Sequence, residues 1–464
     1  MSDGHRFHPT VLREYDIRGI VGETLSAADA EAIGRAFTAM TAAKSGKAMP
    51  RIAVGRDGRL SAPELEAALV RGIRSAGGTA VRIGQGPTPM LYYAAYELPV
   101  EAGIMVTGSH NPPTHNGFKM TVARKPFYGT MIQDLARLAA KGGTTAAQGG
   151  EETADVRAAY TEKLAAALDG ADISGLKVGW DAGNGAAGEI MVQLTARLPG
   201  THRLLNEVID GRFPAHHPDP TEPENLHQLQ ELVATQKLDL GIAFDGDGDR
   251  IGAIDAKGRI VWGDQLLAIL GRDVLQKQPG ATIIADVKAS QALFDEIAKL
   301  GGKPLMWKTG HSLIKVKMME TGSPLAGEMS GHIFFADEYY GFDDALYGAV
   351  RLLRAIARSG KTLAELRDAL PALVNTPEIR IACPDEKKFA VVVALSEDLR
   401  REGAAFNDID GIRINKHGGW WLLRASNTQA VLVARAEAPD ARALEALKAD
   451  LAERLARHGV RFAG

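Results

Sequence analysis

Residues 103–119 read GIMVTGSHNPPTHNGFK, an apolar run followed by a polar loop that contains two prolines. The apolar run predicts a short buried strand, and the prolines prevent a helix from following it. Ser109 and His110 are therefore expected at the tip of a stiff loop. Asn116-Gly117 predicts a second turn just before Lys119. An ordinary polar surface turn is the alternative interpretation.

Strands that alternate with helices along most of the chain predict βαβ units and parallel sheets. Three apolar strands end in Asp57, Asp181 and Asp286, and each is expected to precede a capped helix. This repetition predicts three related α/β domains with mixed or parallel sheets around a central cleft. From Thr376, short strands flanked by helices predict a C-terminal α+β domain with an antiparallel sheet.

A change in composition helps to set the expected domain boundaries. The small, glycine-rich stretch KGGTTAAQGGEE at 141–152 lacks periodicity and marks the first of them. The predicted domains are 1–153, 154–257, 258–370 and 371–464.

Near the start of the chain, Arg18 is expected in a turn that precedes a helix capped by Ser26.

The composition excludes several classes of protein. The chain has 464 residues, is 45% hydrophobic and carries a formal net charge of −3, so no overall basic field attracts nucleic acid or an anionic membrane. Its single cysteine, Cys383, fits a reducing compartment. The start of the chain shows no export signal, and no apolar run approaches the ~20 residues of a membrane span. We expect a cytoplasmic protein that acts as a monomer.

A loop with three carboxylates, Asp245-Gly-Asp247-Gly-Asp249-Arg250, follows an apolar strand. Carboxylates at alternate positions, separated by flexible glycines, can converge on one hard cation. The loop is not an EF-hand, because Arg250 takes the place of the required glycine and Ala256 that of the required glutamate. Three ligands leave positions open for a phosphate oxygen, which suits Mg²⁺. A solvated acidic hairpin is the alternative.

Two more stretches carry groups suited to a sugar phosphate. In GEMSGH, Glu328, Ser330 and His332 alternate, so they are expected on one side of an extended segment, facing sugar hydroxyls. A half-buried strand end is the alternative. The stretch RASNTQ, which begins at Arg424, joins two strands of the last domain and can form a phosphate cradle. A plain hairpin is the alternative there.

Together, the four stretches resemble those of the α-D-phosphohexomutases, in order and one per domain. The sequences of these stretches are most similar to those of the bacterial phosphomannomutase/phosphoglucomutase branch. The resemblance implies that Ser109 is the phosphoserine and also contacts the metal, and that Asp245, Asp247 and Asp249 bind Mg²⁺. It implies hydroxyl contacts from Glu328, Ser330 and His332, and a distal phosphate site made of Arg424, Ser426, Asn427 and Thr428. Weaker correspondences concern Tyr15, Arg18, Lys119, Arg250, Lys288 and His311.

The resemblance also implies the reaction. A phosphoryl group moves between the 1- and 6-positions of glucose or mannose phosphates through a phosphoserine and a 1,6-bisphosphate, with glucose 1,6-bisphosphate as activator. Lys119 and His332 are the candidates for general acid/base catalysis, and Arg18 and Arg250 for charge stabilisation. The alternatives are a phosphoglucosamine mutase, a metal-dependent phosphatase and a non-catalytic protein that binds sugar phosphates.

The sugar motif leads to a prediction about specificity. By the resemblance, Glu328 and Ser330 contact the 3- and 4-hydroxyls, which glucose and mannose present identically. We expect comparable kcat/KM for glucose 1-phosphate and mannose 1-phosphate, and a lower value for glucosamine 1-phosphate, whose ammonium has no expected partner. A steady-state comparison of the three substrates is the measurement. A preference of roughly a hundredfold for glucosamine, nearly 3 kcal/mol, would contradict the prediction.

Overall fold

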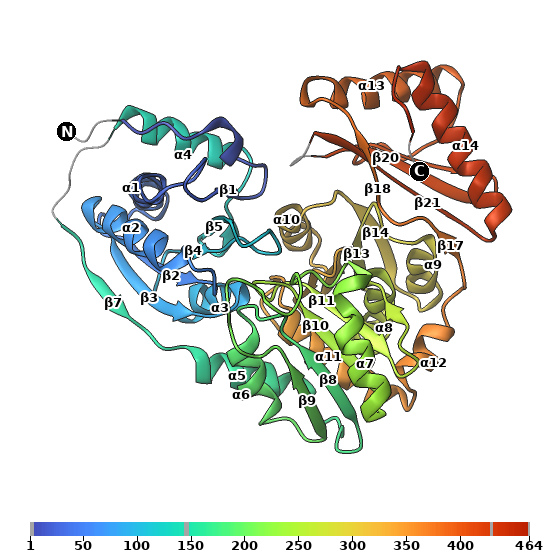
Figure 1. Cartoon of the computed structure of the whole chain (residues 1–464), viewed down its shortest axis with the longest axis horizontal. Coiled ribbons are helices and arrows are strands. Elements are labelled where there is room, and N and C mark those ends of the chain that lie inside the picture. The colour runs from blue at the N-terminus through green and yellow to red at the C-terminus, as the bar shows by residue number, and fades with distance from the viewer. Residues whose placement is uncertain (1–3, 143–147, 427–429, 463–464) are drawn as a thin grey trace.

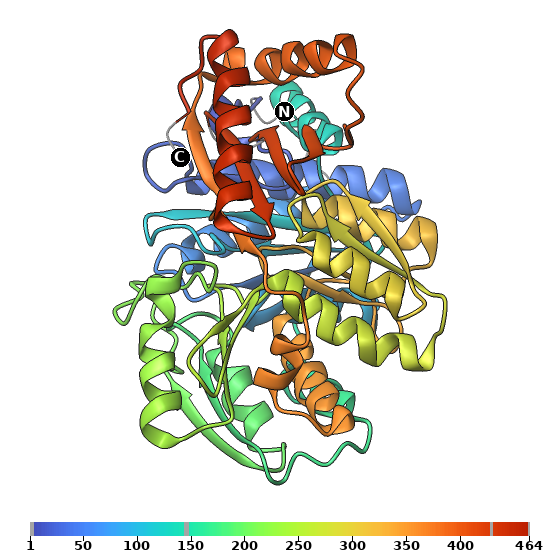
Figure 2. The same cartoon turned by 90° about the vertical axis from the view of Figure 1, so that its right-hand side faces the viewer.

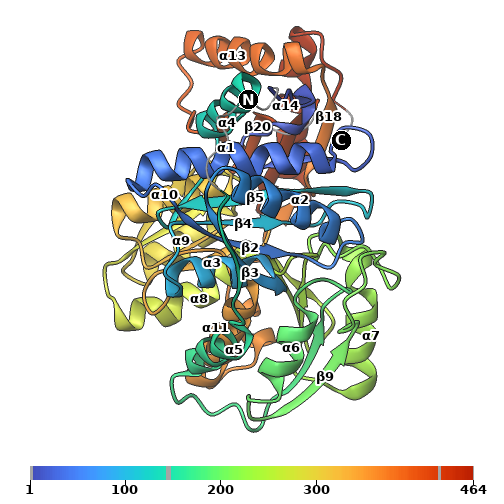
Figure 3. The same cartoon turned by 90° about the vertical axis from the view of Figure 1, so that its left-hand side faces the viewer.

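The computed structural model describes residues 4–142, 148–426 and 430–462, which form four sheets. We refer to the four units built on these sheets as the first to fourth domains. Figure 1 shows the first domain on the left and the fourth at the upper right, above the third. Figures 2 and 3 show the second and fourth domains at opposite ends of the molecule. The boundaries at 153, 257 and 370 stay predictions.

The elements follow the chain in four groups. The first domain contains η1 (Pro9–Val11), β1 (Ile17–Ile20), α1 (Ala27–Ser45), β2 (Arg51–Arg56), α2 (Ala62–Ser75), β3 (Thr79–Gln85), α3 (Thr88–Glu97), β4 (Ala102–Val106), β5 (His115–Val122), β6 (Lys125–Pro126), α4 (Thr130–Lys141) and β7 (Glu151–Thr153). The second contains α5 (Arg157–Ala165), η2 (Ala166–Leu168), β8 (Lys177–Asp181), α6 (Gly188–Thr195), β9 (Thr201–Leu205), η3 (Pro223–Leu226), α7 (His227–Gln236), β10 (Leu240–Phe244), β11 (Ile251–Asp255) and β12 (Ile260–Val261).

The third domain contains α8 (Gly263–Lys277), β13 (Thr282–Asp286), α9 (Gln291–Lys299), β14 (Lys303–Trp307), α10 (His311–Thr321), β15 (Leu325–Gly327), β16 (Ile333–Phe335), α11 (Ala345–Ser359) and α12 (Leu363–Asp368). The fourth contains β17 (Val374–Asn375), β18 (Ile379–Ala382), α13 (Asp385–Arg401), β19 (Ile412–Lys416), β20 (Gly419–Ala425), β21 (Val431–Ala438) and α14 (Ala441–Arg457). All strand pairs in the fourth sheet are antiparallel. Three α/β units and one antiparallel α+β unit confirm the predicted fold class.

The first three sheets share one pattern of strands. The strand orders β3-β2-β4-β5, β9-β8-β10-β11 and β14-β13-β15-β16 are equivalent. In each, the first two neighbour pairs are parallel and the last is antiparallel. The repeated aspartates Asp57, Asp181 and Asp286 lie at the end of the equivalent strands β2, β8 and β13. The internal repeat inferred from the sequence is therefore present in the structure.

This repetition places the three predicted motifs at equivalent positions. The serine loop connects β4 to β5, the three-carboxylate loop connects β10 to β11, and the Glu328 stretch connects β15 to β16. Each loop thus joins the third strand of a unit to its antiparallel fourth strand. Because polar side chains at the end of a buried strand emerge at the edge of the sheet, the three loops are available to meet where the sheets face one another.

Buried apolar side chains tie these units together. One large cluster joins Tyr93 of α3, Trp180 of β8, Leu267 of α8 and Leu353 of α11, all buried. The fourth domain has a separate core that includes Leu395, Trp421 and Leu447. The first three domains therefore share packed interior surface. Within the described ranges, no helix has both the length and the hydropathy that crossing a membrane requires.

Two local predictions were wrong. Asn116-Gly117 lies inside β5, and Arg18 lies in β1; neither is in a turn, because β1 and β5 pair with Arg18 opposite Gly117. The two strands approach so closely that a Cβ on Gly117 would lie 2.2 Å from the carbonyl oxygen of Ile17, which accounts for the glycine.

The expected helix caps are only partly present. The hydroxyls of Ser26 and Ser290 accept backbone N–H groups at the starts of α1 and α9, as predicted. Ser61 makes no such bond at the start of α2, and instead its hydroxyl accepts a hydrogen bond from Asn116. The helix after Asp181 has no side-chain cap. Packing against neighbouring elements therefore stabilises these two helix starts.

Candidate active site

The serine loop and the three-carboxylate loop are in direct contact. The hydroxyl of Ser109 donates a hydrogen bond of 3.3 Å to Oδ2 of Asp245, and the side chain of Ser109 is buried. Gly246 allows this approach, because a Cβ at that position would lie 2.4 Å from the carbonyl oxygen of Ser109. The glycine was expected to provide backbone flexibility, and it also provides the space that the second loop occupies.

Ser109 has an uncommon backbone conformation. Its φ is +51°, in the left-handed region, where a residue with a Cβ costs about 1–3 kcal/mol unless its surroundings hold it in place. Arg59, which is fully buried, supplies that support. Its guanidinium donates hydrogen bonds to the carbonyl oxygens of Ser109 (2.7 Å), Asn111 (2.6 Å), Pro112 (2.5 Å) and His115 (3.0 Å). One side chain thus fixes the course of the whole serine loop.

The aspartates at the strand ends also support these loops. The carboxylate of Asp57 accepts the N–H of Gly108 (3.0 Å) and a hydrogen bond from Arg59 (3.2 Å). In the third domain, Asp286 accepts the N–H of Met329 (3.2 Å) in the equivalent loop. Asp57 and Asp286 are therefore backbone acceptors that set the position of the neighbouring loop, whereas Asp181 accepts the N–H of Gly183, two residues further along the chain.

The three carboxylates of the second loop are completely buried. Lys119 donates to Oδ2 of Asp247 (2.8 Å) and Oδ2 of Asp249 (2.5 Å), and the hydroxyl of Thr107 donates to Asp247 (3.1 Å). Burial and the neighbouring charges of Asp249 and Asp247 raise the pKa of Asp245 well above its ordinary value. Burial also disfavours the ionised form of Asp247. The charge of Lys119 and the hydrogen bonds that Asp247 accepts nevertheless hold the pKa of Asp247 below its ordinary value.

This loop fits a divalent cation. One ligand oxygen from each of Asp245, Asp247 and Asp249 can be chosen so that the three lie within 4.8 Å of one another. Oδ1 of Asp247 and Oδ1 of Asp249 are buried and accept no hydrogen bond from the described residues. Buried carboxylate oxygens without a donor are costly, and a hard cation with oxygen ligands is the group that compensates them.

Two histidines and an additional aspartate adjoin the carboxylates. The rings of His311 and His332 stack with their centroids 5.5 Å apart. Oδ2 of Asp343 lies 3.0 Å from Nδ1 of His332 and 3.6 Å from Nδ1 of His311. Nε of Arg250 donates to Nε2 of His332 (3.1 Å), so this nitrogen is the acceptor and the ring proton belongs on Nδ1, facing Asp343.

The sugar motif adopts a different shape from the one predicted. Residues 328–332 form a tight hairpin turn and not an extended segment, because Gly331 N donates to the carbonyl of Glu328 and Glu328 N donates to that of His332. Glu328 and His332 are buried, whereas Ser330 is half-buried. The turn, and not alternation along a strand, therefore sets the directions of these side chains.

A chain of contacts connects this turn to the first and fourth domains. Oε1 of Glu328 accepts Gly310 N (2.5 Å), and Tyr15 of the first domain donates to the carbonyl of Thr309 (2.9 Å). Asp410 of the fourth domain accepts Thr309 N through Oδ2 (3.0 Å), and the same oxygen accepts Nε of Arg424 (3.0 Å). Residues 309–311 of the third domain are thus contacted by residues of the first, third and fourth domains.

Of the remaining predicted residues, the structure describes Arg18, Lys288 and Ser426. Arg18 donates to the side chain of Asn111 in the serine loop (3.1 Å). Lys288 is buried and lies 3.4 Å from the carboxylate of Glu378 in the fourth domain. Ser426 is buried at the end of β20. Asn427 and Thr428 lie outside the described residues.

Several residues that shape the site were missed from the sequence. Arg59, Asp343 and Asp410 belong to none of the four motifs, and only their three-dimensional contacts distinguish them from other charged residues. In the sequence, Asp57 and Asp286 stand out only because they recur at the ends of predicted strands. The weak signal for Asp343 is a pair of aspartates directly after an aromatic residue, in GFDD at 341–344.

Comparison with known proteins assigns the family. The chain matches phosphoglucomutase/phosphomannomutase alpha/beta/alpha domain I over residues 9–144, domain II over 158–258, domain III over 262–374 and the C-terminal domain over 378–454. It belongs to the phosphoglucomutase/phosphomannomutase family, which confirms the resemblance inferred from the four motifs.

Individual relatives cover nearly the whole chain. A Pseudomonas aeruginosa protein named phosphomannomutase/phosphoglucomutase is 44% identical over 439 residues, which is 95% of this chain and 94% of that protein. A phosphoglucomutase from Neisseria gonorrhoeae is 41% identical over 442 residues, or 94% and 95% of the two chains. The crystal structure of a family protein from Burkholderia thailandensis matches with a TM-score of 0.91 at 41% identity, covering 98% of this chain and 99% of that one.

The hydrogen bonds from Arg59 to four carbonyl oxygens of the serine loop, here called the Arg59 clamp, lead to a prediction. Arg59→Lys keeps the charge but loses the planar fork, so at least two loop carbonyls are left without a donor. We expect the free energy of unfolding to fall by about 3 kcal/mol, and amides at 107–117 to exchange faster with solvent. Denaturant unfolding and hydrogen-exchange mass spectrometry measure the two effects. The control is Arg71→Lys on the adjacent α2, where the side chain is 58% exposed. Unchanged loop exchange in Arg59→Lys would contradict the clamp.

Proposed function

We propose that this protein interconverts hexose 1-phosphates and hexose 6-phosphates, acting on glucose and mannose phosphates through a phosphoserine and a 1,6-bisphosphate. The observation that carries the proposal is the Ser109 hydroxyl, held in a strained backbone conformation 3.3 Å from a carboxylate of the candidate metal loop. The names of the relatives at 44% and 41% identity support the substrate class.

In the proposed reaction, Ser109 Oγ carries a phosphoryl group. A sugar hydroxyl attacks the phosphorus in line, its oxygen forms the new P–O bond, and the bond from phosphorus to Ser109 Oγ breaks. The hydroxyl proton passes to a general base, and the serine oxygen leaves as an anion. The resulting 1,6-bisphosphate turns over and returns its other phosphoryl group to Ser109. Phosphoryl transfer of this kind depends mainly on positioning and on charge neutralisation.

The surroundings of Lys119 and His332 favour different roles for them. Burial alone would lower the pKa of Lys119, but the charges of Asp247 and Asp249 raise it well above its ordinary value. We therefore assign Lys119 to charge stabilisation, as a permanent cation beside the phosphoryl group. His332 has Asp343 behind Nδ1 and Arg250 at Nε2. We assign the proton transfer to Nε2 of His332, once Arg250 turns from it toward a phosphate.

We assign the cation of the carboxylate loop to Mg²⁺, held by Asp245, Asp247 and Asp249 with Ser109 beside them. Such an ion, when bound, neutralises charge on the transferred phosphoryl group. The far phosphate of the substrate is assigned to Arg424, Ser426, Asn427 and Thr428 of the fourth domain. Lys288, His311, Tyr15, Glu328 and Ser330 are assigned to the sugar. Glucose 1,6-bisphosphate would act as activator by phosphorylating an empty Ser109.

The other candidate functions account for fewer features of the candidate active site. A phosphatase must admit water to the phosphoserine, whereas Ser109 is only 2% exposed. A non-catalytic binding protein has no use for a serine held in a strained conformation beside three buried carboxylates. A phosphoglucosamine mutase shares the mechanism and differs in the sugar, and the relatives' names favour glucose and mannose.

Replacing the serine tests the proposed phosphate carrier. Ser109→Ala should lose nearly all interconversion of glucose 1-phosphate and glucose 6-phosphate while it still binds substrate, because the sugar and distal phosphate contacts are elsewhere. A coupled assay and calorimetry measure the two properties. After treatment with glucose 1,6-bisphosphate, the wild type should gain the mass of one phosphoryl group and Ser109→Ala should not. Thr114→Ala, an exposed position in the same loop, is the control and should keep both properties. Near-normal turnover of Ser109→Ala would refute the proposal.

Removing the metal tests the carboxylate loop. A chelator should abolish activity, and added Mg²⁺ should restore it. Asp247→Asn should lower kcat about a hundredfold or more, because charge compensation at the phosphoryl group is lost. Asp172→Asn, an exposed carboxylate of the second domain, is the matched control. Full activity in excess chelator would show that the three carboxylates serve only structure.

A further inference from the structure

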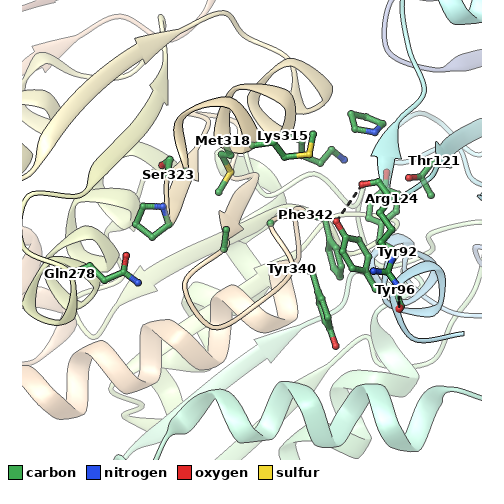
Figure 4. Close-up of a pocket in the computed structure, with 16 residues that line it drawn as sticks. Tyr92, Tyr96, Thr121, Arg124, Gln278, Lys315, Met318, Ser323, Tyr340 and Phe342 are labelled. Atoms are coloured by element: carbon green, nitrogen blue, oxygen red, sulfur yellow. Dashed lines mark hydrogen bonds between the residues drawn. The ribbon is translucent and has the colours of Figure 1, made fainter.

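A cavity of about 260 Å³ lies between the first and third domains. None of Ser109, Asp245, Glu328 and Arg424 lines it. Its walls combine aromatic rings with two cations, namely Tyr92, Tyr96, Tyr340, Phe342, Arg124 and Lys315. In Figure 4, Thr121 and Arg124 lie on one side of the space and Met318 and Ser323 on the other, and Tyr340 lies beside Tyr96. The volume suits a ligand with one ring, somewhat smaller than a drug-sized molecule.

Arg124 adds a positive charge to the cavity wall. It is exposed in the turn between β5 and β6, where its guanidinium donates to the carbonyl of Tyr96 (2.9 Å) and lies 5.3 Å from the centre of the Tyr96 ring. Among the described residues it forms no ion pair. A guanidinium over an aromatic face, with donors left over, recognises a carboxylate or phosphate attached to a ring.

Lys315 connects the cavity wall to the candidate active site. Its ammonium lies 4.4 Å from the centre of the Tyr92 ring and 2.9 Å from Oδ1 of Asp343. The other oxygen of the same carboxylate lies 3.0 Å from His332 and 3.6 Å from His311. An anion in the cavity attracts the Lys315 ammonium, and Asp343 then loses part of the contact that sets its position against the two histidines.

We propose that this cavity binds a small planar anion, an aromatic ring with one carboxylate or phosphate, and that the bound anion alters turnover through Lys315 and Asp343. The rings of Tyr96, Tyr340 and Phe342 pack on one another, with centroids 4.9 to 5.7 Å apart, and form one aromatic wall for the flat face of the ligand, while Arg124 pairs with its charge. The binding part of the proposal depends only on the cavity. The effect on turnover rests on the proposed function.

The test uses 4-hydroxybenzoate as the probe and 4-hydroxybenzamide, which lacks the charge, as the matched ligand control. Isothermal titration should show that the wild type binds the benzoate, and that Arg124→Gln weakens this binding at least tenfold. Arg137→Gln should leave the binding unchanged, because Arg137 is a 67% exposed arginine on α4, away from the cavity. The amide should bind the wild type more weakly than the benzoate. No binding, or equal binding by Arg124→Gln, overturns the site.

Kinetics with the same probe separates the two parts of the proposal. Saturating benzoate should change kcat for glucose 1-phosphate at least twofold in the wild type, with no effect in Arg124→Gln, whose activity without the probe should be normal. A rise in KM alone, reversed by excess substrate, would place the probe in the active site and overturn the proposal. Binding with unchanged kcat overturns the coupling. If the protein has no mutase activity, the titration still decides the site on its own.

Discussion

The ion pairs of Lys119 with Asp247 and Asp249 are the interaction on which the site depends. Three buried carboxylates on one short loop repel one another, and burial removes the water that would otherwise screen them. The compensating ammonium comes from β5 of the first domain, so the second domain can keep this loop buried only when the first is docked against it. Thr107 and Ser109 add hydrogen bonds across the same boundary. The charge that the chemistry requires therefore also joins two domains.

The internal repeat explains how so few residues from distant parts of the chain come together. Each of the first three units places its polar loop between its third strand and its antiparallel fourth strand. Asp57 and Asp286 then accept N–H groups from the loop beside them, which fixes the loop on its own sheet. The fourth domain has a different sheet and reaches the site through Asp410, which binds Thr309 and Arg424 together. Arg413 of the fourth domain also donates to the carbonyl oxygens of Val287 and Ala289, both at 2.7 Å, and Trp420 packs against Val287, so several contacts hold this domain against the third.

Patterns in the sequence predicted the fold class well, because strand–helix alternation and the repeated Asp at a strand end are local signals. They failed where a neighbouring strand decided the outcome. Asn116-Gly117 has the composition of a turn, yet β1 pairs with it and β4 pairs with the residues of β5 that follow it. Ser61 is a good capping residue, yet Asn116 occupies its hydroxyl. Propensity describes an isolated segment, and pairing with distant segments overrides it.

The sequence by itself determined which chemical groups are present: the serine, the three carboxylates, the glutamate and histidine of the third motif, and the arginine of the fourth. Their types and spacing in short stretches carry that information, since a cation or a phosphate requires particular atoms close together along the loop. Only the tertiary structure decided that Ser109 adopts a left-handed conformation, that Arg59 holds its loop, and that Asp343 lies behind both histidines. These depend on contacts between residues tens to hundreds of positions apart, and a single arginine or aspartate has no local pattern that reveals its partner.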